Sequence, residues 1–384
     1  MSVAPARTGV RLAGLDGLRG FACLLVFFYH LRWHARPLDG SRLELKIGAL
    51  DVEPLLTRCD VGVAIFFVLS GLLLSLPFWQ AILSGTAAPR FGPYLWRRAC
   101  RIIPAYYAVL AVVYLLRGGT YTLYGGIDFA LHATFLHTFA DYTYLSVHPA
   151  LWTIGIEFQF YLLLPLIMAG LAWLWQKGGA ALALAVLFLG TWLLDLAVSR
   201  ALSAAAPVVP DPILPDRQSL VAGGTVFSYL KLFAFGIAGA LAVLRWPWSR
   251  RTADFLCAAS LVGIAALIAT GTEAGWRETS AIGWPVNALV LGVLAASLAC
   301  SQFFARLFSA RWLVATGTIS YGIYLWHELV QRAVFDGTLR HQLHGWPVFL
   351  VGGAVALAVT ALLAMLSWRY VERAALRSPC PFRA

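Results

Sequence analysis

Long uninterrupted apolar runs recur along this sequence and constrain its fold more than any other feature. A helix needs about 20 mostly apolar residues to cross the ~30 Å hydrocarbon layer of a bilayer. The 384-residue chain is 60% hydrophobic and only 12% charged, whereas soluble domains are about 25% charged. Because so few charges cannot cover the surface of a water-soluble globule, the sequence predicts a protein that crosses a membrane many times.

The runs predict an all-α bundle of about ten transmembrane helices that forms a single domain over residues 1–384. Short cytoplasmic tails are expected at about 1–12 and 372–384. The apolar stretch 129–139 is too short to span and is expected to lie in the interface or to re-enter the bilayer. The predicted spans are 13–31, 60–83, 98–116, 154–175, 180–199, 226–244, 253–270, 282–300, 311–333 and 348–370.

The net charge of +11 is explained by arginines in loops on one side of the membrane, so no nucleic-acid partner is expected. Cytoplasmic loops of membrane proteins carry an excess of Lys and Arg. That excess is obtained here when both termini are placed in the cytoplasm. The loop after the first span departs from the rule. Its several cations indicate either an anionic group handled at the outer face or ordinary solvated charge.

The six cysteines contain no CxxC pair and lie mostly in or beside apolar runs. Such a pattern fits neither a disulfide framework nor a zinc site. We therefore expect no metal ion.

Arg19 and His30 interrupt the first apolar run, where a charged side chain costs ~3 kcal/mol on insertion scales. The two are eleven residues apart, so at ~100° per residue they share a helix face, about 16 Å apart along the axis. His34 follows one turn later on nearly the same face. The group is either a functional site, or Arg19 reaches the inner headgroups while His30 joins a hydrogen-bond network.

Three more polar groups lie in apolar helices. Glu157, with Tyr161 one turn further on, is expected either to orient an imidazole or to form a buried ion pair. Arg98 and Arg101, one turn apart near the inner face, either grip phosphates or simply anchor the helix. A polar stripe near the end of the chain faces a cavity or makes packing hydrogen bonds worth ~1 kcal/mol each. It contains Ser320, Tyr321, Tyr324 and His327.

These groups, in this order, resemble the motifs of the acyltransferase-3 family of membrane-bound acyltransferases. The resemblance extends from about residue 12 to 373. It includes an arginine and a histidine with ten residues between them, an RxxR pair and a Trp-Ser-Leu-x-x-Glu-x-x-Phe-Tyr pattern. The matching segments are Leu15–Gly20 with His30, Val61–Gly71, Arg98 with Arg101, Leu151–Pro165 and Ile319–His327.

The sequence departs from the family pattern at three positions. Thr153 replaces a common serine, and Phe158 replaces a common second glutamate. Ala64 stands where many members carry aspartate, so no carboxylate role is carried over to that position. Many members also carry a C-terminal extracytoplasmic hydrolase-like domain, which we do not expect in this protein. The chain is therefore expected to be similar to stand-alone members, which modify sugars on lipopolysaccharide, exopolysaccharide, lipo-oligosaccharide or macrolides.

The resemblance implies a multi-pass enzyme of the bacterial cytoplasmic (inner) membrane that takes an acyl group, usually acetyl, from cytoplasmic acyl-CoA. The implied acceptor is a hydroxyl of a polysaccharide, a lipid-linked glycan or a glycosylated small molecule. Arg98 and Arg101 are expected to bind the CoA phosphates, and His30 to act as general base or transient acyl carrier. Arg19 and Glu157 complete the expected catalytic set. Supporting roles are expected for His34, Trp152, Tyr161, Ser320, Tyr321, Tyr324 and His327.

Two other classes remain open at this point. A proton-coupled transporter would also need intramembrane Arg, His and Glu residues, although the sequence shows no repeat of the kind common in transporters. A sensor of CoA or lipid would bind the same groups without catalysis. The sequence leaves open the acyl chain, the side of transfer and the oligomeric state.

Overall fold

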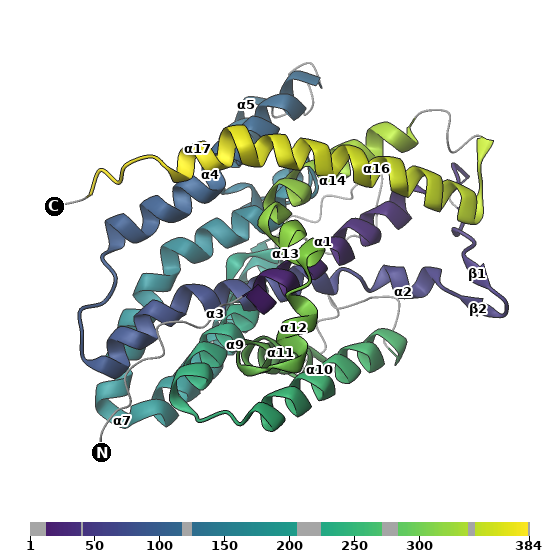
Figure 1. Ribbon diagram of the computed structural model, residues 1–384. Coiled ribbons are helices and arrows are strands. Elements are labelled where there is room, and N and C mark those ends of the chain that lie inside the picture. The colour runs from purple at the N-terminus through teal and green to yellow at the C-terminus, as the bar shows by residue number, and fades with distance from the viewer. Residues whose placement is uncertain are drawn as a thin grey trace. The chain divides into compact units, whose positions relative to one another are not determined.

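The computed structural model describes residues 13–39, 41–116, 125–205, 224–270, 283–336 and 342–382. Helices make up almost all of this part of the chain (Figure 1). Its one sheet is a small antiparallel hairpin of β1 (Lys46–Ile47) and β2 (Leu50–Asp51), with Lys46 opposite Asp51. Gly48 turns the hairpin with φ at 60°, a conformation that glycine adopts without strain. The predicted all-α class is confirmed.

The chain divides into two compact units, each built from separate stretches of sequence. Unit 1 comprises residues 1–69 and 242–374, and unit 2 comprises residues 70–241 and 375–384. The boundary between residues 69 and 70 falls inside α3 (Val61–Ser84).

Unit 1 is built around α1, which packs along α12, α13 and α14, while α14 packs on α16 and α10 packs on α11 (Figure 1). A π-helical turn follows α16, so the described part of the predicted tail 372–384 begins in helix. The remaining helices of this unit are α1 (Ala13–His34), α2 (Glu53–Thr57), α10 (Arg250–Thr270), α11 (Gly283–Cys300), α12 (Phe303–Phe308), α13 (Arg311–Thr318), α14 (Ser320–Phe335), α16 (Gly345–Ser367), η3 (Trp368–Glu372) and α17 (Arg373–Leu376), which reaches into the residues of unit 2.

Unit 2 contains the rest of α3 and two long helices that pack on each other, α4 and α7. Short helices connect them, and they include the predicted interfacial stretch 129–139. The elements are α4 (Phe91–Leu116), α5 (Gly125–Ala133), the 3₁₀ turn η1 (His137–Phe139), α6 (Asp141–Tyr144), α7 (Leu151–Ala205) and α9 (Val226–Arg245), whose last turn belongs to unit 1.

Each of the ten predicted spans falls on a helix, with two differences in continuity. The spans 154–175 and 180–199 both lie in α7, where Gly178 and Gly179 leave helical geometry, the latter with φ at 65°. The span 311–333 is two helices, because Ile319, with φ −99° and ψ 9°, separates α13 from α14.

Six helices within the described residues are long and apolar enough to cross a membrane. They are Gly14–His34, Glu53–Ser84, Phe91–Leu116, Leu151–Leu202, Val226–Arg245 and Gly345–Leu376. These helices support a multi-pass membrane protein. Ten crossings, cytoplasmic termini and a single domain stay predictions, and the N-terminal tail 1–12 lies outside the described residues.

Glycines of the first motif allow α1 to approach its neighbours at backbone distance. A Cβ on Gly17 would overlap the carbonyl oxygen of Phe308, and a Cβ on Gly20 would overlap that of Leu313. Small residues are common where membrane helices pack this closely. The glycines of this motif therefore serve packing.

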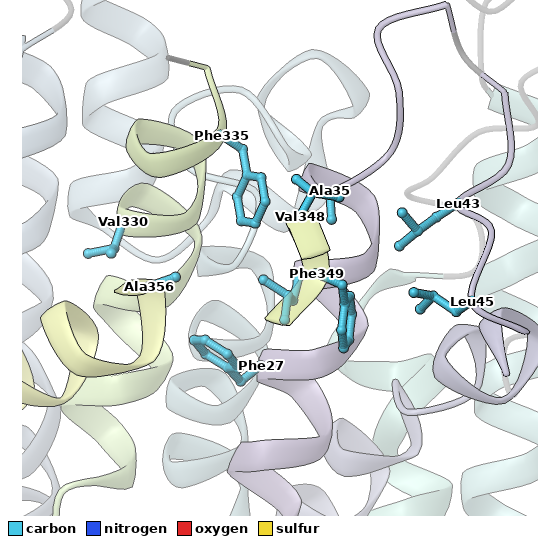
Figure 2. Packing of buried hydrophobic residues seen from close by; sticks show 10 residues of the cluster. Phe27, Ala35, Leu43, Leu45, Val330, Phe335, Val348, Phe349 and Ala356 are labelled. Carbon is cyan, nitrogen blue, oxygen red and sulfur yellow. The ribbon is translucent and has the colours of Figure 1, made fainter. Parts of the chain in front are cut away.

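The last turns of α1 are held by a buried apolar cluster (Figure 2). Phe27 of α1, Phe335 of α14 and Val348 and Phe349 of α16 all belong to this cluster. The side chain of Gln331 also donates a hydrogen bond to the Phe27 carbonyl over 3.0 Å. The cluster keeps the segment of α1 that carries His30 against α14. Its members are Phe27, Leu31, Ala35, Leu43, Leu45, Val330, Phe335, Val348, Phe349 and Ala356.

A buried ion pair joins the end of α1 to α2. Arg32 is 2% exposed, and its Nη1 lies 2.6 Å from Glu53 Oε1, which also accepts a hydrogen bond from Arg36 Nη2 over 2.9 Å. Both guanidinium groups stack on the Trp33 ring, at 4.6 and 4.4 Å from its centroid. Arg32 and Arg36, two of the cations that follow the first predicted span, thus form ion pairs within the protein.

Glu53→Ala is expected to lower the free energy of unfolding by about 3 kcal/mol, because it leaves the buried Arg32 guanidinium without its carboxylate. Thermal unfolding of the purified protein in detergent measures the change. Asp336→Ala is the matched control. It removes an exposed pair, 3.4 Å from Arg332, and should cost less than about 1 kcal/mol. Equal effects of the two variants would contradict the assignment.

Candidate functional site

His30 lies against His327 within unit 1, an arrangement that brings the first and the last motif together. His30 Nδ1 is 3.2 Å from His327 Nε2, and the ring centroids are 4.8 Å apart. The same Nδ1 is 3.0 Å from the carbonyl oxygen of Val26. His327 is 1% exposed, whereas His30 is half-buried.

The hydrogen bonds of this pair determine which nitrogen of His30 is basic. His327 Nδ1 lies 2.7 Å from the carbonyl oxygen of Tyr324, and a carbonyl oxygen only accepts, so Nδ1 of His327 carries a hydrogen. In neutral His327 the Nε2 is then an acceptor, and His30 Nδ1 must donate to it or to Val26. The lone pair of neutral His30 is therefore on Nε2, the nitrogen of a general base.

Of the rest of the predicted stripe on α14, Tyr324 contacts this pair. The Ser320 hydroxyl donates to the carbonyl of Gly317 over 2.8 Å, and the Ser320 carbonyl accepts from the Cys23 thiol. The Tyr324 ring lies edge-on to Phe66 at 6.1 Å and packs on His327 at 5.5 Å. Tyr321 is buried in the same helix.

Arg19 and His34 occupy the two ends of the face of α1 that carries His30. Both side chains are half-buried. The eleven residues from Arg19 to His30 correspond to about 16 Å of helix, so Arg19 does not touch the imidazole. The expected place of Arg19 in the catalytic set stays a prediction.

Glu157 lies in a second polar group, within unit 2. Its Oε1 accepts hydrogen bonds from the hydroxyls of Ser70 on α3 and Tyr161 on α7, both over 2.7 Å. Arg98 and Tyr94 of α4 lie close enough to Glu157 and Tyr161 to interact with them electrostatically. The structure thus gathers three of the predicted residues, Arg98, Glu157 and Tyr161, in one place.

Sequence reasoning missed Ser70 and Tyr94, the other members of this group. Ser70 lies in the second motif, Val61–Gly71, and Tyr94 lies one turn before Arg98 on the same face of α4. Those two placements are the signals that would have found them. The expected role of Glu157 in orienting His30 stays a prediction, since its described hydrogen bonds go to Ser70 and Tyr161.

The Arg98 side chain has a feature suited to an anionic ligand. Its Nε is buried and, among the described residues, has no hydrogen-bond partner. A guanidinium with an unused donor binds phosphate or carboxylate readily, because its planar fork of N–H donors matches their oxygens. Arg101 lies one turn further along α4 and is also half-buried. By contrast, the described residues contain no cluster of three or more His, Cys, Asp or Glu side chains arranged for a metal ion.

Trp152 lies at the start of α7 in an aromatic stack. Its ring is 5.8 Å from that of Tyr144 and 5.3 Å from that of Tyr229. The Tyr144 hydroxyl in turn donates to the carbonyl of Gly224 over 3.0 Å. These contacts indicate that Trp152 fixes the start of the helix that carries Glu157.

A profile of the acyltransferase-3 family, described as an acyltransferase domain, matches residues 12–365 of this sequence. The chain belongs to the acyltransferase-3 family. The family motifs divide between the units: the first-helix and last motifs form the His30–His327 pair in unit 1, and the RxxR and Trp–Glu motifs meet in unit 2. Membership in this family supports acyl transfer as the activity of the chain.

Two relatives illustrate the similarity. The chain is 29% identical to Nodulation protein 10 of Rhizobium leguminosarum bv. viciae, over 94% of this chain and 92% of that protein. It is 25% identical to O-acetyltransferase OatA of Staphylococcus aureus, over 94% of this chain but only 56% of OatA. No solved structure matches the chain.

The tautomer of His30 can be tested directly. Solid-state NMR of protein with ¹⁵N-labelled histidine, in lipid at pH 8, is expected to show His30 with its hydrogen on Nδ1. Subtraction of the His30→Gln spectrum assigns the signal. His327→Phe should keep that tautomer, because the Val26 carbonyl 3.0 Å from Nδ1 remains as an acceptor, and Arg332→Gln on the exposed face of α14 should keep it as well. A His30 hydrogen on Nε2 in the wild-type protein would contradict the derivation.

Proposed function

We propose that the chain is a membrane-bound O-acyltransferase that moves an acetyl group from cytoplasmic acyl-CoA to a hydroxyl of a carbohydrate-containing acceptor. The observation that carries the proposal is the His30–His327 pair, which leaves Nε2 of His30 as a base. Family membership and the name of one relative, O-acetyltransferase OatA, support acyl transfer to oxygen.

The donor would bind at Arg98 and Arg101. Guanidinium groups one turn apart can hold the phosphates of CoA in bidentate fashion, and the unused Nε of Arg98 supports this role. Glu157, Ser70, Tyr94 and Tyr161 would then set the position of Arg98 on α4. The acyl thioester supplied by bound CoA is the electrophile.

His30 would remove the proton from the acceptor hydroxyl as that oxygen attacks the thioester carbonyl carbon. The new C–O bond replaces the C–S bond, and the proton passes to the departing sulfur, so the products are the ester and the CoA thiol. His327 keeps the imidazole oriented while His30 carries the proton. A transient acyl-imidazole on His30 is the two-step form of the same chemistry. Arg19, about 16 Å along α1 from His30, would instead help to bind the donor.

The acceptor class rests on the resemblance to the stand-alone, sugar-modifying members of the family. A polysaccharide, a lipid-linked glycan and a glycosylated small molecule all present suitable hydroxyls. The chain would act in the bacterial cytoplasmic (inner) membrane with both termini in the cytoplasm. Mass spectrometry of surface glycans from cells with and without the protein identifies the acceptor.

A proton-coupled transporter is the second candidate, favoured by one observation. The hydrogen bond between the imidazoles of His327 and His30 is a link of the kind a proton relay uses. Purified protein in vesicles with labelled acetyl-CoA separates the two classes. Label that appears on the glycan supports the enzyme, while label that accumulates in the lumen without transfer supports transport.

His30→Ala is expected to reduce transfer of label from acetyl-CoA to surface glycan by about 10²- to 10⁴-fold, the usual contribution of a general base. Membrane insertion and the thermal unfolding temperature should stay near those of the wild type. His344→Ala, a histidine at the start of α16, is the control and should retain activity. Full activity in a correctly inserted His30→Ala variant would refute the proposed role.

Arg98→Ala is expected to weaken binding of coenzyme A about tenfold or more, because charge-assisted hydrogen bonds to phosphate are lost. The dissociation constant is measured by calorimetry with coenzyme A alone, which needs no acceptor. Arg97→Ala removes the neighbouring exposed arginine and is the matched control, with a smaller effect. If Arg98→Ala bound coenzyme A with unchanged affinity, the assignment of the donor site to α4 would be wrong.

A further inference from the structure

A buried histidine pair lies in unit 2, apart from the residues considered so far. His132 at the end of α5 and His137 in η1 are both fully buried, and their rings stack at 4.1 Å with 10° between the planes. His132 Nδ1 is 3.1 Å from Asp128 Oδ1, which also accepts from the Ser146 hydroxyl over 2.7 Å. Buried polar groups are costly unless they are hydrogen-bonded, and a hydrogen-bonded network makes its surroundings rigid.

His137 makes direct contact with the first turns of α7. Its Nε2 lies 3.2 Å from the carbonyl oxygen of Leu151, so this nitrogen carries a hydrogen and donates it. Its ring fills the space above Gly155, where an added Cβ would lie only 2.8 Å from Cε1 of the imidazole. The absence of a side chain at Gly155 is therefore what admits His137 to this position.

Gln159 holds the same segment one turn further along α7. Its Nε2 donates to the carbonyl of Phe135 over 2.6 Å and to the Thr138 hydroxyl over 3.0 Å. The Phe158 ring stacks on Phe135 at 4.2 Å. We call the segment 135–138, in these contacts with α7, the α7 clamp.

The clamp and Glu157 lie on different sides of α7. Leu151, Gly155 and Gln159 follow at intervals of four residues and share one face. Glu157 is two residues from Gly155, which is about 200° around the helix, and it faces Ser70 of α3. The clamp therefore contacts α7 on the side opposite to the Glu157 carboxylate.

The clamp is also tied to the helix that carries Arg98. The Tyr106 hydroxyl of α4 donates to the His132 carbonyl over 2.9 Å, and the Tyr107 hydroxyl donates to the Ala133 carbonyl over 2.6 Å. Those bonds join α4 to the segment that leads into the clamp. The segment that leads into the clamp is thus itself held in place by α4.

We propose that His137 and Gln159 are positioning residues that set the place of Glu157, and through it of Arg98, in the donor site. The proposal rests on the proposed binding of acyl-CoA at Arg98. His137 acts as a hydrogen-bond donor and a spacer on α7, and it does not take part in proton transfer.

The surroundings of His137 support a donor rather than an acid–base role. η1 lies outside the candidate spanning helices. Burial, and then the neighbouring His132, lower the pKa of His137 from 6.5 to about 3. The imidazole therefore stays neutral at physiological pH, with its one N–H directed at the Leu151 carbonyl. A glutamine, which also donates an N–H, should replace it.

Calorimetry with coenzyme A tests the proposal on the full-length protein. His137→Leu and Gly155→Ala are expected to weaken coenzyme A binding about tenfold, since displacements near 1 Å have large effects at such sites. His137→Gln should stay within about threefold of the wild type, because it keeps the donor. Gly170→Ala, on the same helix where an added Cβ meets open space, is the matched control.

The Glu157→Gln background separates positioning from general destabilisation. If the clamp acts through Glu157, His137→Leu should cause little further loss in that background, because the two changes are coupled. An additive loss would overturn the proposal, and so would full affinity in both His137→Leu and Gly155→Ala. Equal losses in His137→Gln and His137→Leu would also contradict a donor role.

Infrared spectroscopy distinguishes failure of the clamp from failure of the donor site. The carboxylate band of Glu157, obtained by difference from Glu157→Gln, reports its hydrogen bonds to Ser70 and Tyr161 without any ligand. If wild-type protein binds no coenzyme A but His137→Leu shifts this band, the donor site is wrong and the clamp stands. An unshifted band in His137→Leu would overturn the clamp whatever coenzyme A does.

Discussion

A membrane bundle excludes water from its interior, so each polar group there must be satisfied by another part of the protein. In unit 1 this constraint produces a short chain of hydrogen bonds from the Tyr324 carbonyl through His327 to His30. Because the carbonyl can only accept, the direction of every bond in the chain follows. The same requirement that makes buried histidines costly thus determines which nitrogen of neutral His30 carries the hydrogen and which carries the lone pair.

Unit 2 meets the same constraint with a carboxylate. The hydroxyls of Ser70 and Tyr161 donate hydrogen bonds to the Glu157 carboxylate, and Arg98 lies close enough to interact electrostatically with this group. Arg98 retains an unused donor on Nε among the described residues. A guanidinium that is positioned but incompletely hydrogen-bonded suits a site for an anionic ligand that comes and goes.

Glycine supplies the close approaches on which both groups depend. Gly17 and Gly20 let α1 lie against the backbone of α12 and α13, and Gly155 lets His137 rest on α7. In each place a methyl group would displace the neighbouring backbone or ring. The motif glycines therefore belong to the site as much as its charged residues do, although they touch no substrate.

The sequence by itself determined the all-α membrane class, the position of each predicted span on a helix, the family, and most of the candidate residues. Those follow from local properties: run length, charge and the order of motifs. Only the tertiary structure showed that His327 partners His30 and that Ser70 and Tyr161 bind Glu157, since these contacts, apart from the one within α7, join residues far apart in the chain. The sequence did not predict the helix break at Ile319, because the apolar pattern continues through it. It also did not predict the burial of Arg32, because the partner of Arg32, Glu53, lies outside that helix. Periodicity reports which residues share a helix face, but the choice of partner across a bundle depends on packing that no local pattern encodes.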